Sequence, residues 1–122
     1  MTSGDFVRKP DVCSAGGPPP SCRVVGAPPS QHPWIDDRQA PLYVVRYPAA
    51  RTDQEVYEAH AAIRSIYEAT TVPVAWVVDG SEVRDAPATQ RRLVAGHEQR
   101  VRALAERRCA GLALVLPNRV VR

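Results

Sequence analysis

The sequence predicts an α/β fold: a small, mainly parallel sheet of about three strands in the order strand-helix-strand-helix-strand, preceded by a disordered leader rich in proline and glycine. Three observations support this prediction. Val74 to Val78 form an apolar run without polar alternation, which is typical of a strand covered on both faces. Helical patterns flank this run on both sides. The first 39 residues show neither the helical nor the strand period.

The leader is defined by its composition. Residues 1–39 carry seven prolines and four glycines, at positions 10, 18, 19, 20, 28, 29 and 33 and at positions 4, 16, 17 and 26. Such a segment buries too little apolar surface to offset the entropy lost on ordering. We therefore predict a disordered leader over residues 1–39, its end held to the domain by Trp34, and an α/β domain over residues 40–122.

The first strand and the first helix have clear local signals. Leu42 to Tyr47 is rich in β-branched and aromatic residues and ends before Pro48. Thr52-Asp53-Gln54-Glu55 has the pattern of a capping box, which predicts a helix over residues 53–69. Apolar residues recur there at intervals of three and four, and Pro73 follows its end.

The second strand, the second helix and the third strand follow in turn. The second strand covers Val74 to Val78 and ends at Asp79. Asp85 is expected to be the N-cap of a helix that has Pro87 in its first turn and extends to Arg108. Leu112 to Leu116 form a third apolar strand. Right-handed crossovers would make these strands parallel.

Composition argues against several classes of protein. The formal net charge is only +3, and the arginines of the second helix surround it without interleaved aromatic residues, so no specific nucleic-acid binding is expected. Cys13, Cys22 and Cys109 match no zinc pattern, and we predict no cofactor. No segment is long and apolar enough for a signal sequence or a membrane span, which predicts a soluble, cytoplasmic protein with no membrane partner.

The candidate site lies where the second strand ends and the second helix begins, because ligands bind at the carboxyl edge of such sheets. Its residues are Asp79, Ser81, Asp85, Thr89, Gln90 and Arg91. The acids could serve as general bases or cation ligands, but turn and cap roles are the commoner explanation. Gln90 should point inward and anchor a loop carbonyl or line a small pocket. Ser81 and Thr89 have hydroxyls nearby that could accept a phosphoryl group, although a serine in an exposed loop is far more often a turn residue.

Two further side chains are expected to be buried. His97 falls on or beside the inward stripe of the second helix, where a histidine that hydrogen-bonds a backbone carbonyl is favoured over a metal ligand, since His60 is the only other histidine of the predicted domain. Trp76 is expected in the core.

From Pro41 onward the chain resembles the STAS superfamily, the anti-anti-sigma-factor-like domains, and in particular divergent bacterial members of unassigned function. The residues that carry the resemblance are Ala40-Pro41-Leu42, Thr52-Asp53, Val78-Asp79, Ala86-Pro87-Ala88 with Gln90-Arg91-Arg92, and Gly111 to Leu116 with Asn118 and Arg119. Phosphoswitching STAS domains carry an Asp-Ser-Ser-Gly type motif where this chain has Asp85-Ala86-Pro87-Ala88. Alanine and proline have no hydroxyl, so the resemblance predicts no phosphorylation switch there.

The resemblance also implies an interaction role. We expect a non-catalytic regulatory or protein-interaction module, not an enzyme, that binds another protein through the edge formed by residues 79–90. The alternative is a sensor of a small anion or a nucleotide bound at the start of the second helix. A third possibility is a gene fragment without function, because family members continue with another helix after the equivalent of Arg119. In that case the helix-free side of Leu112 to Leu116 should expose apolar surface and favour self-association.

Overall fold

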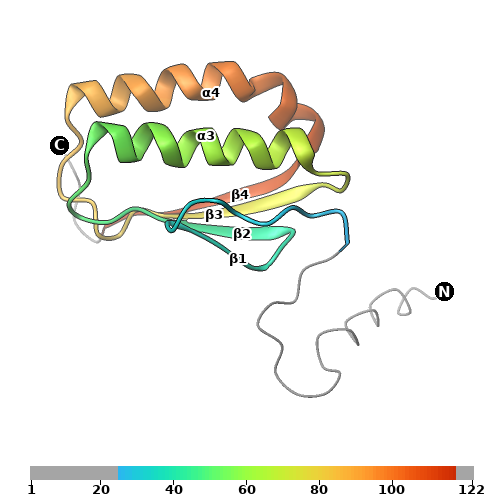
Figure 1. The fold of residues 1–122 in the computed structure, drawn as a ribbon. Helices are drawn as coiled ribbons and strands as arrows, with labels where there is room; N and C mark the ends of the chain where they lie inside the picture. The colour runs from blue at the N-terminus through green and yellow to red at the C-terminus, as the bar shows by residue number, and fades with distance from the viewer. Residues whose placement is uncertain (1–24, 118–122) are drawn as a thin grey trace, which may run out of the picture.

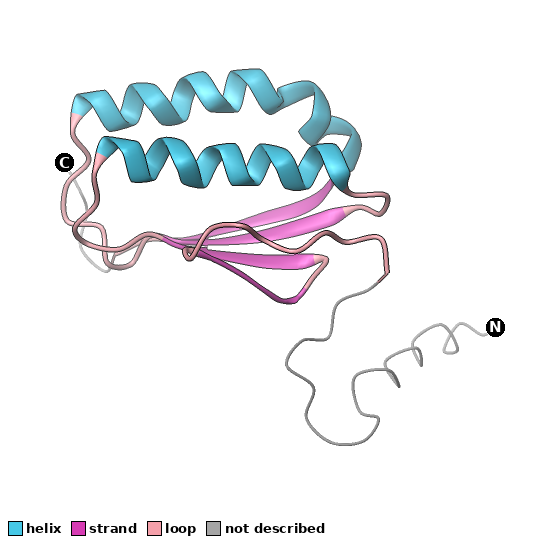
Figure 2. Ribbon diagram, viewed as in Figure 1, coloured by secondary structure: helices cyan, strands magenta, loops and turns pink. Residues whose placement is uncertain are grey.

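The computed structural model describes residues 25–117, in which both helices lie on the same face of a twisted sheet (Figure 1). The strands are β1 (Ile35–Gln39), β2 (Leu42–Arg46), β3 (Val74–Asp79) and β4 (Cys109–Val115), and the helices are α3 (Asp53–Ala69) and α4 (Ala88–Arg108). The strand order is β1-β2-β3-β4. β2, β3 and β4 are parallel, and β1 is antiparallel to β2, so the sheet is mixed (Figure 2).

The sheet has four strands, and the prediction of about three is therefore wrong by one. The additional strand is β1, which lies inside the segment predicted to be a disordered leader. Its sequence, Ile-Asp-Asp-Arg-Gln, contains one apolar residue and no strand pattern. A strand at the edge of a sheet needs few apolar residues, because most of its side chains face solvent. In β1 only Ile35 reaches the core, where it is 5% exposed.

Residues 25–34 also pack against the domain. The Tyr43 hydroxyl donates a hydrogen bond to the Pro28 carbonyl at 2.6 Å, and the Thr71 amide donates to the Gly26 carbonyl at 3.1 Å. Gly26 has a φ of 99°, a conformation that favours glycine. The Trp34 ring lies 5.3 Å from that of Tyr47, as expected for a residue that holds this end to the domain. Residues 1–24 of the predicted leader lie outside the described residues.

Helix α3 has the predicted bounds and the predicted cap. The Glu55 amide donates to Thr52 Oγ1 at 3.1 Å, and the Thr52 amide donates to Glu55 Oε1 at 2.8 Å. These two bonds satisfy backbone donors that have no partner inside the helix. The helix ends at Ala69, and the amide of Thr70 closes its last turn on the Ile66 carbonyl.

Helix α4 begins at Ala88, and the prediction of Asp85 as its N-cap is wrong. Pro87 is the N-cap residue, with ψ at 151° and no side-chain cap bond. The helical region is disfavoured for a residue before proline, which keeps Ala86 outside the helix, and the extended ψ of Pro87 makes Ala88 the first helical residue. At its other end the Arg108 guanidinium donates to the Tyr67 carbonyl at 2.6 Å, which joins the ends of the two helices.

The core lies between the sheet and the helices. Tyr43 and Trp76 stack with ring centroids 5.0 Å apart, and Tyr67 of α3 lies 5.6 Å from Trp76. Trp76 is 3% exposed, which confirms its prediction as a core residue. Val45 and Val74 complete this face of the sheet and are fully buried.

Among the described residues, no helix covers the opposite face of the sheet (Figure 2). Leu42, Val44, Ala75 and Val77 lie there and are only half-buried. The apolar run of β3 led us to expect cover on both faces. That prediction is wrong for residues 25–117, because both helices lie on one face.

The capping box gives a first prediction. Thr52→Ala should lower the free energy of unfolding by about 1 kcal/mol, because the Glu55 amide loses its acceptor. Thr52→Ser keeps a hydroxyl at the cap and should preserve most of that stability. Urea denaturation of the three proteins checks this. Equal losses in both variants would contradict the role assigned to the cap.

Candidate functional site

The largest hollow among the described residues is an apolar groove between α4 and β4, with a volume of about 1000 Å³. It exists because α4 hardly contacts β4 and packs mainly on α3. The strand register aligns Leu112 with Trp76 and Leu114 with Val78, so both leucines lie on the face of the sheet that carries the helices. We call this hollow the α4–β4 groove; its apolar lining includes Val78, Val94, Val101, Leu112, Leu114 and Leu116.

The leucines of β4 are unusually exposed. Leu112 is 59% exposed, Leu114 is 60% exposed and Leu116, just beyond the strand, is 68% exposed. Apolar surface was expected on the helix-free side of this strand, and Val115 lies there and is 42% exposed. The leucines, however, lie on the helix side, which α4 leaves open. Full burial of one such side chain stabilises a complex or a fold by about 1.5–3 kcal/mol. Covering these leucines would therefore lower the free energy of the system.

One wall of the groove is polar. The Tyr47 hydroxyl and His60 Nε2 are hydrogen-bonded at 2.6 Å, and the rings of His60 and His97 meet edge to face with centroids 4.7 Å apart. Gln90 lies on the same wall, where its Nε2 donates to the Arg51 carbonyl at 3.2 Å. We call Tyr47, His60, Gln90 and His97 the polar wall.

Burial keeps the polar wall uncharged. Burial, the larger cause, and electrostatic repulsion from His97 together lower the pKa of His60 to about 4. Burial also lowers the pKa of His97 to about 4, together with the charges of Arg100 and Arg64. The pKa of Tyr47 is raised to about 12 by burial and by the charge of Glu98. At neutral pH the wall therefore presents neutral hydrogen-bonding groups.

Four buried polar atoms among residues 25–117 lack a hydrogen-bond partner within the chain, and all four belong to residues that line this groove. They are His60 Nδ1, Trp76 Nε1, Gln90 Oε1 and His97 Nε2. An unpaired buried group of this kind costs about 1–3 kcal/mol. His97 was expected to bond a backbone carbonyl; it is buried as predicted, but its Nε2 has no such partner.

The six residues of the predicted site lie around the loop between β3 and the start of α4, and most of their polar groups bind within the chain. Asp79 Oδ1 accepts from the Ser81 amide at 3.0 Å in a turn, and the hydrogen bonds from Ser81 lower the pKa of Asp79. The Asp85 carbonyl accepts from the Arg51 guanidinium, and the Arg91 guanidinium donates to the Ala86 carbonyl.

Thr89 and Gln90 both bind the carboxylate of Asp53, at 3.4 Å and 3.1 Å. The start of α4 therefore already has a negative charge beside it. Gln90 points inward and anchors a loop carbonyl, as predicted. The loop itself forms the end of the groove through Gly80, Val83 and Ala86.

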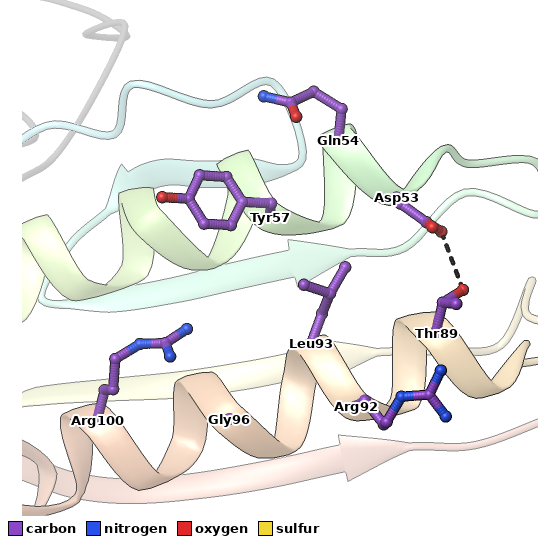
Figure 3. Close-up of a pocket in the computed structure, with 8 residues that line it drawn as sticks. All are labelled: Asp53, Gln54, Tyr57, Thr89, Arg92, Leu93, Gly96 and Arg100. Atoms are coloured by element: carbon purple, nitrogen blue, oxygen red, sulfur yellow. Dashed lines mark hydrogen bonds between the residues drawn. The ribbon is translucent and has the colours of Figure 1, made fainter.

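A second, shallower hollow of about 550 Å³ lies between the exposed sides of α3 and α4 (Figure 3). Asp53 and Tyr57 face it from α3, and Thr89, Leu93 and Arg100 face it from α4. The hydrogen bond between Asp53 and Thr89 closes one end of it. Its lining is open and mixed in charge, and no buried orphan atom belongs to it, so it offers a ligand less than the α4–β4 groove does.

Neither a metal centre nor a membrane span is present in the part of the chain that the structure describes. No three histidine, cysteine or acidic side chains between residues 25 and 117 gather closely enough to hold a metal ion. No helix in the same range is both long and apolar enough to cross a bilayer.

Comparison with known proteins finds no match: no family model, no curated protein and no solved structure is significantly similar to the chain. The α/β architecture with parallel crossovers is a finding of the structure itself, whereas the STAS resemblance stays a prediction.

The neutral histidines predict acid sensitivity. In the unfolded chain their pKa is about 6.5, and in the folded chain it is about 4. Between these values only the unfolded chain takes up the protons, so the free energy of unfolding should fall as the pH decreases from about 6.5 to about 4.

His97→Gln removes one of the two titrating groups and keeps a polar side chain. Its free energy of unfolding, measured with urea between pH 4 and pH 8, should depend less steeply on pH than that of the native chain. An unchanged slope would contradict the burial of a neutral imidazole at this position.

Proposed function

We propose that the chain is a non-catalytic, STAS-like protein-interaction module that binds an apolar segment of a partner protein in the α4–β4 groove. The edge formed by residues 79–90 takes part as the end of that groove, where the partner meets Gly80, Val83 and Ala86. The observation that supports this proposal most directly is the exposure of Leu112, Leu114 and Leu116 in a row beside an open groove.

The shape and chemistry of the groove suit a partner segment. Contiguous exposed apolar surface beside polar residues is characteristic of interaction sites. An amphipathic helix commonly binds by placing its apolar side in such a groove. The polar wall adds hydrogen-bonding groups at one side, which would favour partner segments that carry a matching polar side chain.

The anion-sensor alternative has less support. The carboxylate of Asp53 lies at the start of α4 and would repel an anion there. Arg91, the expected countercharge, directs its guanidinium back to the Ala86 carbonyl. No observation in the described residues favours this alternative over the groove.

Site-specific photo-cross-linking tests the proposal. A benzophenone amino acid in place of Leu114 should cross-link a partner in the cells that produce the protein, because position 114 lies in the groove. The matched control is the same probe in place of Tyr57, which is 54% exposed but lies away from the groove. Equal cross-linking from both positions would contradict the proposed surface.

The identified partner then allows a quantitative test. Leu112→Glu puts a charge on the groove and should weaken binding of the purified partner at least tenfold in calorimetry, since about 1.5–3 kcal/mol of apolar burial is lost. Thermal stability should change little, because Leu112 is exposed. Unchanged affinity would refute the groove as the binding site.

A further inference from the structure

The two edges of the sheet differ in how they are protected. Edge strand β1 carries Asp36, Asp37 and Arg38, and its register with β2 shifts between Asp36 and Gln39. Charges and irregularities of this kind prevent an edge from pairing with another chain. β4, at the other edge, has the sequence Cys-Ala-Gly-Leu-Ala-Leu-Val, without a charge or a proline.

Among the described residues, no strand pairs with the outer side of β4, and the backbone there is regular. Its only register irregularity with β3 lies near its start, between Val74 and Ala75, so residues 111–115 are regular. The Val115 carbonyl accepts from the Gly80 amide on the β3 side. Because backbone groups alternate along a strand, the amides and carbonyls of Leu112 and Leu114 point to the free edge.

We propose that β4 pairs antiparallel with β4 of a second copy of this chain, which makes a two-fold symmetric dimer with one continuous sheet. This inference rests on the proposed function, because the dimer would bury the same leucines of β4. The partner in this case is a second copy of the chain. Pairing centred on Ala113 would place each Leu112 opposite the Leu114 of the other copy. Gly111 would then stand opposite Val115, a small residue beside a larger one.

The helix side of this arrangement would bury four leucines. Leu112 and Leu114 of both copies would form one cluster at the two-fold axis, next to the groove of each chain. Cross-strand apolar pairs of this kind stabilise a sheet, and a two-fold interface requires a surface that complements itself. An apolar strand without charges meets that requirement.

The charges of α4 suit the same symmetry. Glu98, Arg102 and Glu106 line the groove at intervals of four residues and alternate in sign. A two-fold axis runs the two α4 helices in opposite directions. An offset that sets each Glu98 beside the Arg102 of the other copy would pair unlike charges across the axis.

Two double variants with the same number of introduced charges test this pairing in the full chain. Leu112→Lys with Leu114→Lys puts like charges opposite each other across the axis and should raise the dimer dissociation constant at least 100-fold. Leu112→Lys with Leu114→Glu puts unlike charges opposite each other and should retain the dimer. Sedimentation equilibrium over a range of concentrations measures both, and circular dichroism checks that both fold.

The outcomes separate this inference from the proposed function. A native chain that stays monomeric at all concentrations overturns the dimer, whereas a different protein cross-linked at position 114 would still support the groove as an interaction site. Equal behaviour of the two double variants overturns the antiparallel pairing at β4. A native dimer lost only in the two-lysine variant supports it.

Discussion

Both helices lie on one face because the chain crosses the sheet twice in the same direction. β2, β3 and β4 are neighbours in sequence order and parallel, so α3 and α4 each form a crossover of the same hand. Two crossovers of one hand that move in one direction must pass over the same face. The core, the uncovered opposite face and the open groove beside β4 all follow from this topology. A third element on the helix side would close the groove, and the described residues supply none.

The sequence predicts those elements of the structure whose boundaries are determined by neighbouring residues. α3 was predicted to the residue because a capping box and Pro73 mark its ends within a few positions. β1 was missed because its pairing with β2, not its own pattern, makes it a strand. The Asp85 cap was wrong because the restriction that Pro87 places on Ala86 prevails over the preference of aspartate for a cap position.

The candidate site shows the same division. The six polar residues predicted to bind a partner or a ligand lie at the end of β3, on the loop after it and at the start of α4. The sequence could not show that Asp53 and Arg51 already bind several of them. The groove was missed as a site, since it depends on the face that α4 covers. The sequence did contain an indication of the groove. Every second residue from Leu112 to Leu116 is a leucine, so one face of this strand is rich in leucine.

Buried polar atoms in residues that line the groove lower the stability of the isolated fold. Four buried polar atoms without partners lower stability, and a core of apolar residues of similar volume would avoid that loss. The unpaired ring nitrogens of His60 and His97 therefore lower the stability of the free chain.

The position of α3 in the chain has a kinetic consequence. β2 pairs with β3, and the whole of α3 lies between them in sequence. Closing so long a segment is slow unless the helix has already shortened it. We therefore expect the Thr52–Glu55 cap to form before the parallel strands meet. Substitutions at this cap should then mainly slow folding, whereas substitutions in β4, which joins the sheet across a second helix, should mainly change the unfolding rate.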